Sequence, residues 1–213
     1  GRRRRHSARA LVPPLIAPIG RSQLMRELRE QVRQVAPHEA PVLIVGEPGT
    51  GREAFARYIH SLSARSSGPF VTAVGGALTE GVVVNGGARA KCVLERADGG
   101  TLYISVLEDL SAAAQRLLLA AIDTGSYLRK SGTGALRLDA RVVSCAQPGF
   151  ETRGAEAFRI DLLSHLNVLT FRVPPLREYA EDVPDPLRYY VHTLGDEERL
   201  PFRRFSVAAQ NRL

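Results

Sequence analysis

A short apolar run followed at once by a glycine-rich loop constrains the fold of this chain more than any other feature. Val42 to Val45 are apolar and mostly β-branched, and the chain continues Gly46-Glu47-Pro48-Gly49-Thr50-Gly51-Arg52-Glu53. An amphipathic stretch from Arg52 to Leu62 follows directly. This order predicts a strand, a tight loop and a helix, in which glycines let successive backbone N–H groups close around a phosphate at the helix N-terminus. We therefore expect an α/β unit with a phosphate loop at residues 46–53.

The phosphate loop departs from the pattern G-x-x-x-x-G-K-[ST] at its last two positions, which here are Arg52 and Glu53. Lysine normally adds a positive charge on the β- and γ-phosphates, and the Ser/Thr after it holds Mg²⁺. Arginine is always cationic and can grip phosphate in a bidentate way, but its planar fork is shaped differently from an ammonium group. Phosphate binding is compatible with Arg52, whereas hydrolysis is an open question. The alternative is that residues 46–51 form only a flexible turn.

Helical and extended patterns alternate along the rest of the chain. Helices are expected at Ser22–Val35, Arg52–Leu62, Ser111–Ile122, Ala155–Leu166 and Glu181–Leu194, and strands at Pro41–Val45, Phe70–Val74, Thr101–Val106, Leu138–Ala146 and Thr170–Val173. The glycine-rich stretch from Gly75 to Arg89 has no clear period and is interpreted as a loop or a poor helix. Alternating strands and helices favour a mostly parallel sheet with helices on both faces. In such sheets ligands bind at the carboxyl ends of strands, where the phosphate loop falls.

Composition is typical of a globular protein, with 44% hydrophobic and 24% charged residues. The net charge of +7 arises mainly from a basic start, since Arg2 to Arg5 and Arg9 supply five of 29 basic residues and leave 24 against 22 acidic ones. That segment can touch phosphate backbones, but it is more typical of a solvated linker. No apolar stretch approaches the roughly 20 residues that span a bilayer. Cys92 and Cys145 have no metal-ligand spacing, which favours free thiols in a reducing cytoplasm.

Several ordered segments carry a resemblance to a known family. Beside GEPGTGRE at residues 46–53, these are Ala56-Arg57-Tyr58-Ile59-His60, Glu95 to Leu102, Phe158-Arg159-Ile160-Asp161-Leu162, Pro174-Pro175-Leu176-Arg177-Glu178 and Glu181-Asp182-Val183-Pro184. From Ile19 to Gly195 the chain resembles the AAA+ ATPase domain of the NtrC class of bacterial enhancer-binding regulators, which drive sigma-54 RNA polymerase. The stretch from Leu200 to Asn211 is similar to NtrX-type nitrogen-response regulators. The resemblance implies the three-layer fold of a P-loop NTPase.

The composition of residues 1–18, basic at first and then rich in proline, predicts a linker. The resemblance implies that residues 19–195 are the AAA+ core and residues 196–213 the start of a truncated helical lid. Because the chain begins with Gly1 and ends at Leu213 inside a helical pattern, we expect a piece of a longer protein. The missing flanks would be a receiver domain and a helix-turn-helix domain that binds DNA. The family further implies self-association as a dimer or ring, RNA polymerase as a partner, and a cytoplasmic location.

The residues that the family uses for hydrolysis are replaced. Its second strand ends in an Asp that positions Mg²⁺ and a Glu that polarises water, and Ser105 and Val106 stand in their places. Serine offers an oxygen to a metal, but valine offers no acceptor for a water proton. Glu108 and Asp109 lie nearby, yet the family pattern has an acidic residue there without a catalytic role. Whether Mg²⁺ takes part therefore stays open, and no dedicated metal site is expected.

Three further positions bear on nucleotide chemistry. Ala146 and Gln147 replace a Thr-Asn pair that reads the γ-phosphate, and the Gln147 amide can still donate a hydrogen bond. Arg159 matches the first of two arginine fingers that reach a neighbouring subunit, and His165 occupies the position of the second. The loop that carries G-A-F-T-G-A and grips sigma-54 is missing from residues 79–94. Arg177 and Glu178 are compatible either with a domain-packing ion pair or with a subunit interface.

Three functions are compatible with these residues. The first is a regulatory domain that binds ATP or ADP without hydrolysis or sigma-54 remodelling, the second an active ATPase that drives transcription, and the third a nucleotide-free scaffold for oligomerisation. The predicted nucleotide-binding residues are Gly46, Glu47, Pro48, Gly49, Thr50, Gly51, Arg52, Glu53, Ser105 and Gln147, with Arg159 as the candidate arginine finger.

Overall fold

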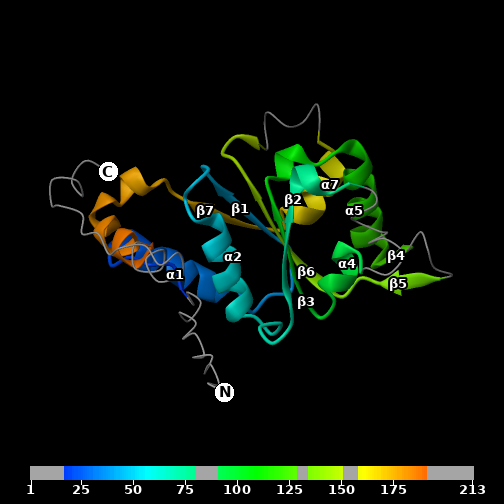
Figure 1. The fold of residues 1–213 in the computed structure, drawn as a ribbon, viewed down its shortest axis with the longest axis horizontal. Coiled ribbons are helices and arrows are strands. Elements are labelled where there is room, and N and C mark those ends of the chain that lie inside the picture. The colour runs from blue at the N-terminus through cyan, green and yellow to red at the C-terminus, as the bar shows by residue number, and fades with distance from the viewer. Residues whose placement is uncertain (1–16, 80–90, 129–133, 151–157, 191–213) are drawn as a thin grey trace, which may run out of the picture.

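The computed structural model describes residues 17–79, 91–128, 134–150 and 158–190. Its centre is a five-stranded sheet with the strand order β2-β3-β6-β1-β7 (Figure 1). These strands are β1 Val42–Gly46, β2 Phe70–Val74, β3 Gly100–Ser105, β6 Ala140–Ala146 and β7 Leu169–Val173. Neighbouring strands in this sheet pair in parallel. The predicted parallel sheet is confirmed, and its switch in strand order puts the end of β1 between β6 and β7.

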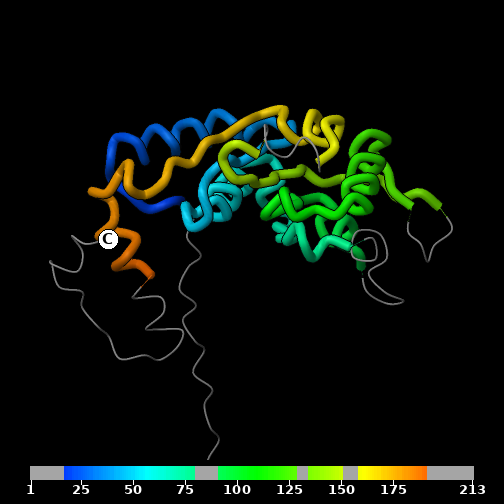
Figure 2. The backbone as a smooth tube through the Cα atoms, turned by 90° about the horizontal axis from the view of Figure 1, so that it is seen from above, coloured from blue at the N-terminus to red at the C-terminus, as the bar shows by residue number. Residues whose placement is uncertain are grey.

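Helices cover both faces of the sheet (Figures 1 and 2). The helices α1 Gln23–Val35 and α2 Arg52–Ser61 pack on one face, and α4 Val93–Arg96, α5 Ala112–Thr124 and α7 Ile160–Leu166 pack on the other. Alternate residues of β6 feed the two cores: Val143 packs with α1 and α2, while Val142 packs with the opposite group. A strand buried on both faces is mostly apolar, and Arg141 and Ser144 are the polar residues of β6.

Serine caps fix the starts of α1 and α5. The Ser22 hydroxyl accepts a hydrogen bond from the Met25 N–H at the start of α1, and the Ser111 hydroxyl accepts one from the Ala114 N–H at the start of α5. Each cap satisfies an N–H group that has no partner inside its helix. The left-handed Gly125, with φ of 62°, ends α5. Both predicted starts are confirmed.

Two expected helices differ from the structure, and one pair of strands was not expected. The helix expected from Ala155 begins at Ile160, because Phe158 is buried in the core and Arg159 is the extended N-cap residue. The helix expected from Glu181 is preceded by two 3₁₀ turns, Leu176–Glu178 and Ala180–Asp182, and helical residues begin at 184. A hairpin of β4 Ser126–Leu128 and β5 Ala135–Arg137 was not predicted.

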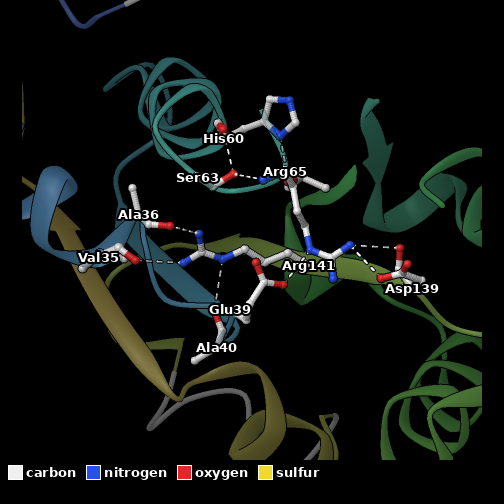
Figure 3. Close-up of polar contacts among 10 residues, drawn as sticks. Val35, Ala36, Glu39, Ala40, His60, Ser63, Arg65, Asp139 and Arg141 are labelled. Atoms are coloured by element: carbon white, nitrogen blue, oxygen red, sulfur yellow. Dashed lines mark hydrogen bonds and ion pairs between the residues drawn. The ribbon is translucent and has the colours of Figure 1, made fainter. Parts of the chain in front are cut away.

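The amino end of the sheet is closed by a buried arginine (Figure 3). Arg141, near the start of β6, is 2% exposed and donates hydrogen bonds to the carbonyl oxygens of Val35, Ala36 and Ala40 over 3.0, 2.7 and 3.2 Å. These carbonyls lie at and just beyond the end of α1, where the helix dipole is negative and favours a cation. Burial lowers the pKa of Arg141 from its ordinary value. The contacts lock α1 to the sheet at the end opposite the phosphate loop.

Two further expectations concern the cysteines and the chain ends. Cys92 and Cys145 are buried and free, as predicted. In the part of the chain that the structure describes, no helix is long and apolar enough to cross a bilayer. Most of the linker at residues 1–18, the shortened loop at 79–94 and the lid start at 196–213 lie outside the described residues. The division at residues 18 and 195 therefore stays a prediction.

Candidate nucleotide site

The phosphate loop leaves the carboxyl end of β1 and enters α2 through two left-handed glycines. Gly49 has φ of 83° and Gly51, the N-cap residue of α2, has φ of 82°. No atom lies within 4 Å of a Cβ built on either glycine, so the backbone conformation and not lack of space selects glycine there. Gly46 is different, because a Cβ there would lie 2.9 Å from Thr50 Oγ1 and 3.0 Å from the Val173 carbonyl. The loop thus has the shape of an anion-binding turn at a helix N-terminus.

Two hydrogen bonds inside the loop hold this shape. Arg52 donates from Nη1 to the Gly46 carbonyl over 3.0 Å, so its guanidinium folds back along the loop. The Thr50 hydroxyl donates to the Glu47 carbonyl over 2.8 Å. Glu53, in the place of the metal-binding Ser/Thr, instead accepts a hydrogen bond from Arg57 one turn later in α2. Arg52 therefore remains with the loop, while Glu53 turns along the helix surface.

A bidentate ion pair joins the phosphate loop to a segment 130 residues away in the sequence. Arg177 donates from Nη1 and Nη2 to the two carboxylate oxygens of Glu47 over 2.9 and 2.7 Å. The hydrogen bond from Arg177 lowers the pKa of Glu47, against a smaller opposing effect of burial. Of the two roles that the sequence left open for Arg177, the described residues support an ion pair within the chain. Sequence reasoning placed Glu47 in the site but did not find its partner.

The end of β3 carries no carboxylate. Ser105 Oγ lies 3.5 Å from the Ala73 carbonyl, to which it donates a long hydrogen bond across the edge of the sheet. Val106 follows with φ of 53°, a left-handed conformation that is unusual for a β-branched residue. The Val106 carbonyl lies against Gly75, where a Cβ would come within 2.1 Å of it. The chain turns sharply at the position where the family has its second acid.

Glu108 and Gln147 meet between β3 and β6. The backbone N–H of Gln147 donates to Glu108 Oε1 in a short hydrogen bond, while Glu108 Oε2 is buried and has no hydrogen-bond partner in the described residues. This hydrogen bond from the Gln147 backbone holds the Glu108 side chain against the loop that follows β6. Asp109 is exposed beside Gly76. Nothing in this geometry gives Glu108 or Asp109 the role of the missing acids.

The candidate arginine finger lies on a different part of the domain. Arg159 donates to both carboxylate oxygens of Asp161 over 3.0 and 2.6 Å, and its backbone N–H donates to Gln115 of α5. The hydrogen bond that Arg159 donates to Asp161 raises the pKa of Arg159. His165, on the same helix, lies 3.6 Å from Asp123. In the described chain Arg159 and His165 thus bond to α5 and α7 and not to the phosphate loop, so the structure does not bring them to the other predicted site residues.

A hollow of about 680 Å³ adjoins the end of β1. It lies between α1 and the end of β7, and its lining includes Leu24, Leu28, Val45, Pro148 and Pro174. This hollow is within the range of volumes that small-molecule sites have. Within the described residues no group of three or more His, Cys, Asp or Glu side chains is placed to hold a metal ion.

Comparison with known proteins identifies the family. Residues 18–172 match the model of the "Sigma-54 interaction domain". The C4-dicarboxylate transport transcriptional regulatory protein DctD of Pseudomonas aeruginosa is 35% identical over 92% of this chain and 45% of its own length. Crystal structures of NtrX from Brucella abortus in complex with ADP and with ATP are each 30% identical, with TM-scores of 0.82 and 0.79. They match 92% and 89% of this chain, and 46% and 44% of the NtrX chain.

The chain therefore spans less than half the length of these relatives. The predicted resemblance to NtrX-type regulators is confirmed by the two NtrX structures. The P-loop NTPase fold with its parallel sheet is confirmed by the family match and by the P-loop NTPase domain of a sigma-54 transport activator from E. coli, which has a TM-score of 0.51. The match covers the phosphate loop, the end of β3 and the start of α7 together. The chain belongs to the Sigma-54 interaction domain family, the AAA+ domain of NtrC-type regulators.

Proposed function

We propose that this chain is the nucleotide-binding regulatory domain of a bacterial two-component transcription regulator, and that it binds ATP or ADP without hydrolysing it. The observation that carries the proposal is the phosphate loop itself. Gly49 and Gly51 adopt left-handed conformations ahead of α2, while the neighbouring strand end offers Ser105 and Val106 instead of acids. The NtrX structures with ADP and ATP support the choice of ligand.

The loop residues fit a di- or triphosphate. Backbone N–H groups at the start of α2 and the guanidinium of Arg52 provide donors and positive charge, which a helix N-terminus reinforces. The phosphate of a bound nucleotide accepts hydrogen bonds from these donors. Arg52 has to exchange its hydrogen bond to Gly46 for one to phosphate, which a charge-assisted bond favours. Gln147, on the loop after β6, is the proposed contact nearest to the end of the phosphate chain.

The same residues do not fit a tightly held Mg²⁺ or a general base. Ser105 bonds to Ala73, and Glu53 bonds to Arg57. Mg²⁺ at nucleotide sites is held by one or two carboxylates together with phosphate oxygens, and hydrolysis requires an acceptor for the proton of water. Each 1.36 kcal/mol added to the activation free energy slows a reaction about tenfold. Loss of such groups therefore lowers the rate of hydrolysis by orders of magnitude. The active ATPase is therefore the less supported function.

Regulation would then come from nucleotide-dependent self-association, as a dimer or a ring. Arg159 is exposed at the start of α7 and away from the phosphate loop, which is compatible with reaching a neighbouring subunit. The proposal includes a receiver domain and a DNA-binding helix-turn-helix domain in the full-length cytoplasmic protein, with residues 1–18 as linker and 196–213 as the start of the lid. RNA polymerase is a proposed partner, without remodelling of sigma-54.

Calorimetric titration with ADP and ATP tests the binding, and two glycines provide a matched pair of variants. Gly51→Ala puts a side chain on a left-handed residue of the loop, and Gly125→Ala does the same at the end of α5, with open space at both. Both variants should lose a similar amount of stability, about 1 kcal/mol. Only Gly51→Ala should weaken binding. Wild-type protein that gives no heat and no thermal shift at millimolar nucleotide would instead support the nucleotide-free scaffold.

A further inference from the structure

The segment from Leu176 to Asp182 is here called the bridging segment. Near both of its ends it forms polar contacts with residues that are far away in the sequence. Near its start, Arg177 forms the bidentate pair with Glu47 of the phosphate loop. At its end, Asp182 is 1% exposed and accepts hydrogen bonds from the backbone N–H groups of Arg21 and Ser22 over 2.6 and 2.8 Å. The bridging segment therefore connects the phosphate loop to the residues that lead into α1.

The bridging segment is short and internally bonded. Its two 3₁₀ turns are closed by backbone hydrogen bonds from Glu178 to Pro175, from Tyr179 to Leu176 and from Asp182 to Tyr179, over 2.9, 3.1 and 2.9 Å. Tyr179 is buried between the two turns and packs in the core with α1 and α2. The hydrogen bonds of both turns and the burial of Tyr179 stiffen the chain between Arg177 and Asp182.

Asp182, at the end of the bridging segment, makes close contacts with residues 20–22. Besides the two N–H groups, the Ser22 hydroxyl donates to Asp182 Oδ2, and a Cβ on Gly20 would lie 2.4 Å from that oxygen. Burial acts to raise the pKa of Asp182, but the hydrogen bonds from Ser22 and Arg21 outweigh it and hold the pKa below its usual value. Arg29 donates to the carbonyls of Pro18 and Gly20, so residues 18–22, the leading segment, are held together.

The carboxylate of Glu47 belongs to a loop whose N–H donors are arranged to bind an anion. At short range this carboxylate and a bound phosphate, both negatively charged, repel each other. The fork of Arg177 fixes both carboxylate oxygens and neutralises them, as bidentate arginine pairs do. With Arg177 removed, Glu47 is free to turn toward the loop donors and to repel a phosphate.

We infer that Arg177 is a positioning residue of the nucleotide site, and that the bridging segment links its pairing with Glu47 to the leading segment. Arg177 keeps Glu47 away from bound phosphate. Its pair with Glu47 adds to the buried Tyr179 in holding the bridging segment, and so strengthens the hold of Asp182 on the leading segment. Coupling between sites is reciprocal, so nucleotide in the loop tightens the leading segment and a loosened leading segment weakens nucleotide binding. The nucleotide half of this inference rests on the proposed function.

Hydrogen exchange in the absence of nucleotide tests the mechanical half. The amides of Arg21 and Ser22 are the probes, because they donate directly to Asp182. Arg177→Gln should raise their exchange rates about two- to fivefold, the loss expected for an exposed ion pair. Arg33→Gln is the control, because Arg33 is also exposed and pairs with Glu30 within α1 instead of with the phosphate loop. Unchanged exchange at Arg21 and Ser22 in Arg177→Gln overturns the inference.

Titration with ADP tests the positioning role by rescue. Arg177→Gln should bind ADP about two- to fivefold more weakly than wild type. The double variant Glu47→Gln/Arg177→Gln should bind ADP more tightly than Arg177→Gln, because no carboxylate remains to repel phosphate, but more weakly than wild type, because the pair that holds the bridging segment is still absent. A purely structural role for Arg177 predicts no rescue, and that result overturns the inference.

Exchange with ADP present separates the inference from the proposed function. In wild type, ADP should protect the amides of residues 46–52 together with those of Arg21 and Ser22. Protection at residues 46–52 alone overturns the coupling and leaves nucleotide binding intact. Protection at neither place overturns the proposed function, while the measurements without nucleotide still decide the coupling.

Discussion

The guanidinium of Arg52 donates a hydrogen bond to the backbone carbonyl of Gly46 over 3.0 Å, and so it spans the phosphate loop from its last turn to its first residue. Arg52 stands where the family pattern has lysine. Its side chain is long enough to reach back over the loop, and it keeps its charge whatever the surroundings. The substitution thus preserves a cation at the loop while changing the shape that this cation presents to phosphate.

Two replacements of Arg52 should separate the effect of its charge on ADP binding from the effect of its shape. Arg52→Ala should weaken ADP binding about 10- to 100-fold, because a charge-assisted hydrogen bond is worth about 1.5–3 kcal/mol. Arg52→Lys keeps the charge and should bind within about threefold of wild type. Arg33→Ala, which removes an exposed pair with Glu30 of α1, is the control and should change affinity less than about twofold. Wild-type affinity in Arg52→Ala would place the phosphates elsewhere.

The contact of the Val106 carbonyl with Gly75 predicts a sharp difference between adjacent glycines. Gly75→Ala should lower the free energy of unfolding by about 1–3 kcal/mol, because its Cβ would lie 2.1 Å from that carbonyl. Gly76→Ala should change it by less than about 0.5 kcal/mol, since its nearest neighbour is Asp109 Cβ at 3.6 Å. Urea unfolding of both variants measures the difference. Equal effects would mean that the turn at Val106 relaxes freely.

Removal of the Ser144 hydroxyl should be stabilising. Ser144 is fully buried in the central strand β6, and its Oγ has no hydrogen-bond partner in the described residues. Ser144→Ala should raise the free energy of unfolding by about 0.5–1 kcal/mol, because an unpaired buried hydroxyl is unfavourable. Ser111→Ala removes a paired hydroxyl from the cap of α5 and should lower it by about 1 kcal/mol. A loss of stability in both variants would indicate a partner for Ser144 Oγ.

Much of this architecture is readable from the sequence, because its signals are local. Ser22 and Ser111 mark helix starts, and the glycine loop fixes where β1 ends and α2 begins. The late start of α7 is not local: the backbone of Arg159 is held by Gln115, 44 residues earlier. The hairpin of β4 and β5 has strands of only three residues, too short for a period to be recognised.

The structure brings some of the predicted site residues together and not others, for the same reason. The loop residues 46–53 are contiguous, so their grouping follows from the sequence. Arg177 reaches Glu47 across 130 residues, and no spacing rule indicates such a pair. The carboxyl ends of β3, β1 and β6 adjoin in the sheet, so Ser105 and Gln147 lie at the same edge as the loop. Arg159 does not lie at this edge, so its proposed role as an arginine finger would require contact with a neighbouring subunit.

Burial of His60 predicts a dependence of stability on pH. Its Nδ1 lies 2.8 Å from Thr101 Oγ1 and its ring packs edge-on against Phe70. Burial lowers the pKa of His60 below 6.5, although a backbone hydrogen bond at Gly68 acts in the opposite direction. The unfolded chain then binds the proton more readily than the folded one. The contribution is complete above pH 6.5 and is lost as the pH falls through the lower, folded-state pKa.

Unfolding of wild type and His60→Gln at pH 7.5 and pH 5.5 checks this sign. The stability difference between the two proteins should be smaller at pH 5.5, because only wild type loses the contribution of a neutral imidazole. His165→Gln, with its exposed ring beside Asp123, is the control for general effects of removing a histidine. A difference that grows as the pH falls would show that His60 is stabilised in its charged form.

Phosphate release under conditions of proven binding tests the central claim most directly. With ATP and Mg²⁺ at concentrations that saturate the calorimetric signal, the account predicts binding heat and no release of phosphate above the rate without protein. Ser105→Asp/Val106→Glu, which restores both acids at the end of β3, is the comparison for how much activity the fold still supports. Release by the wild-type protein that Arg52→Ala abolishes would contradict the claim that this domain binds nucleotide without hydrolysing it.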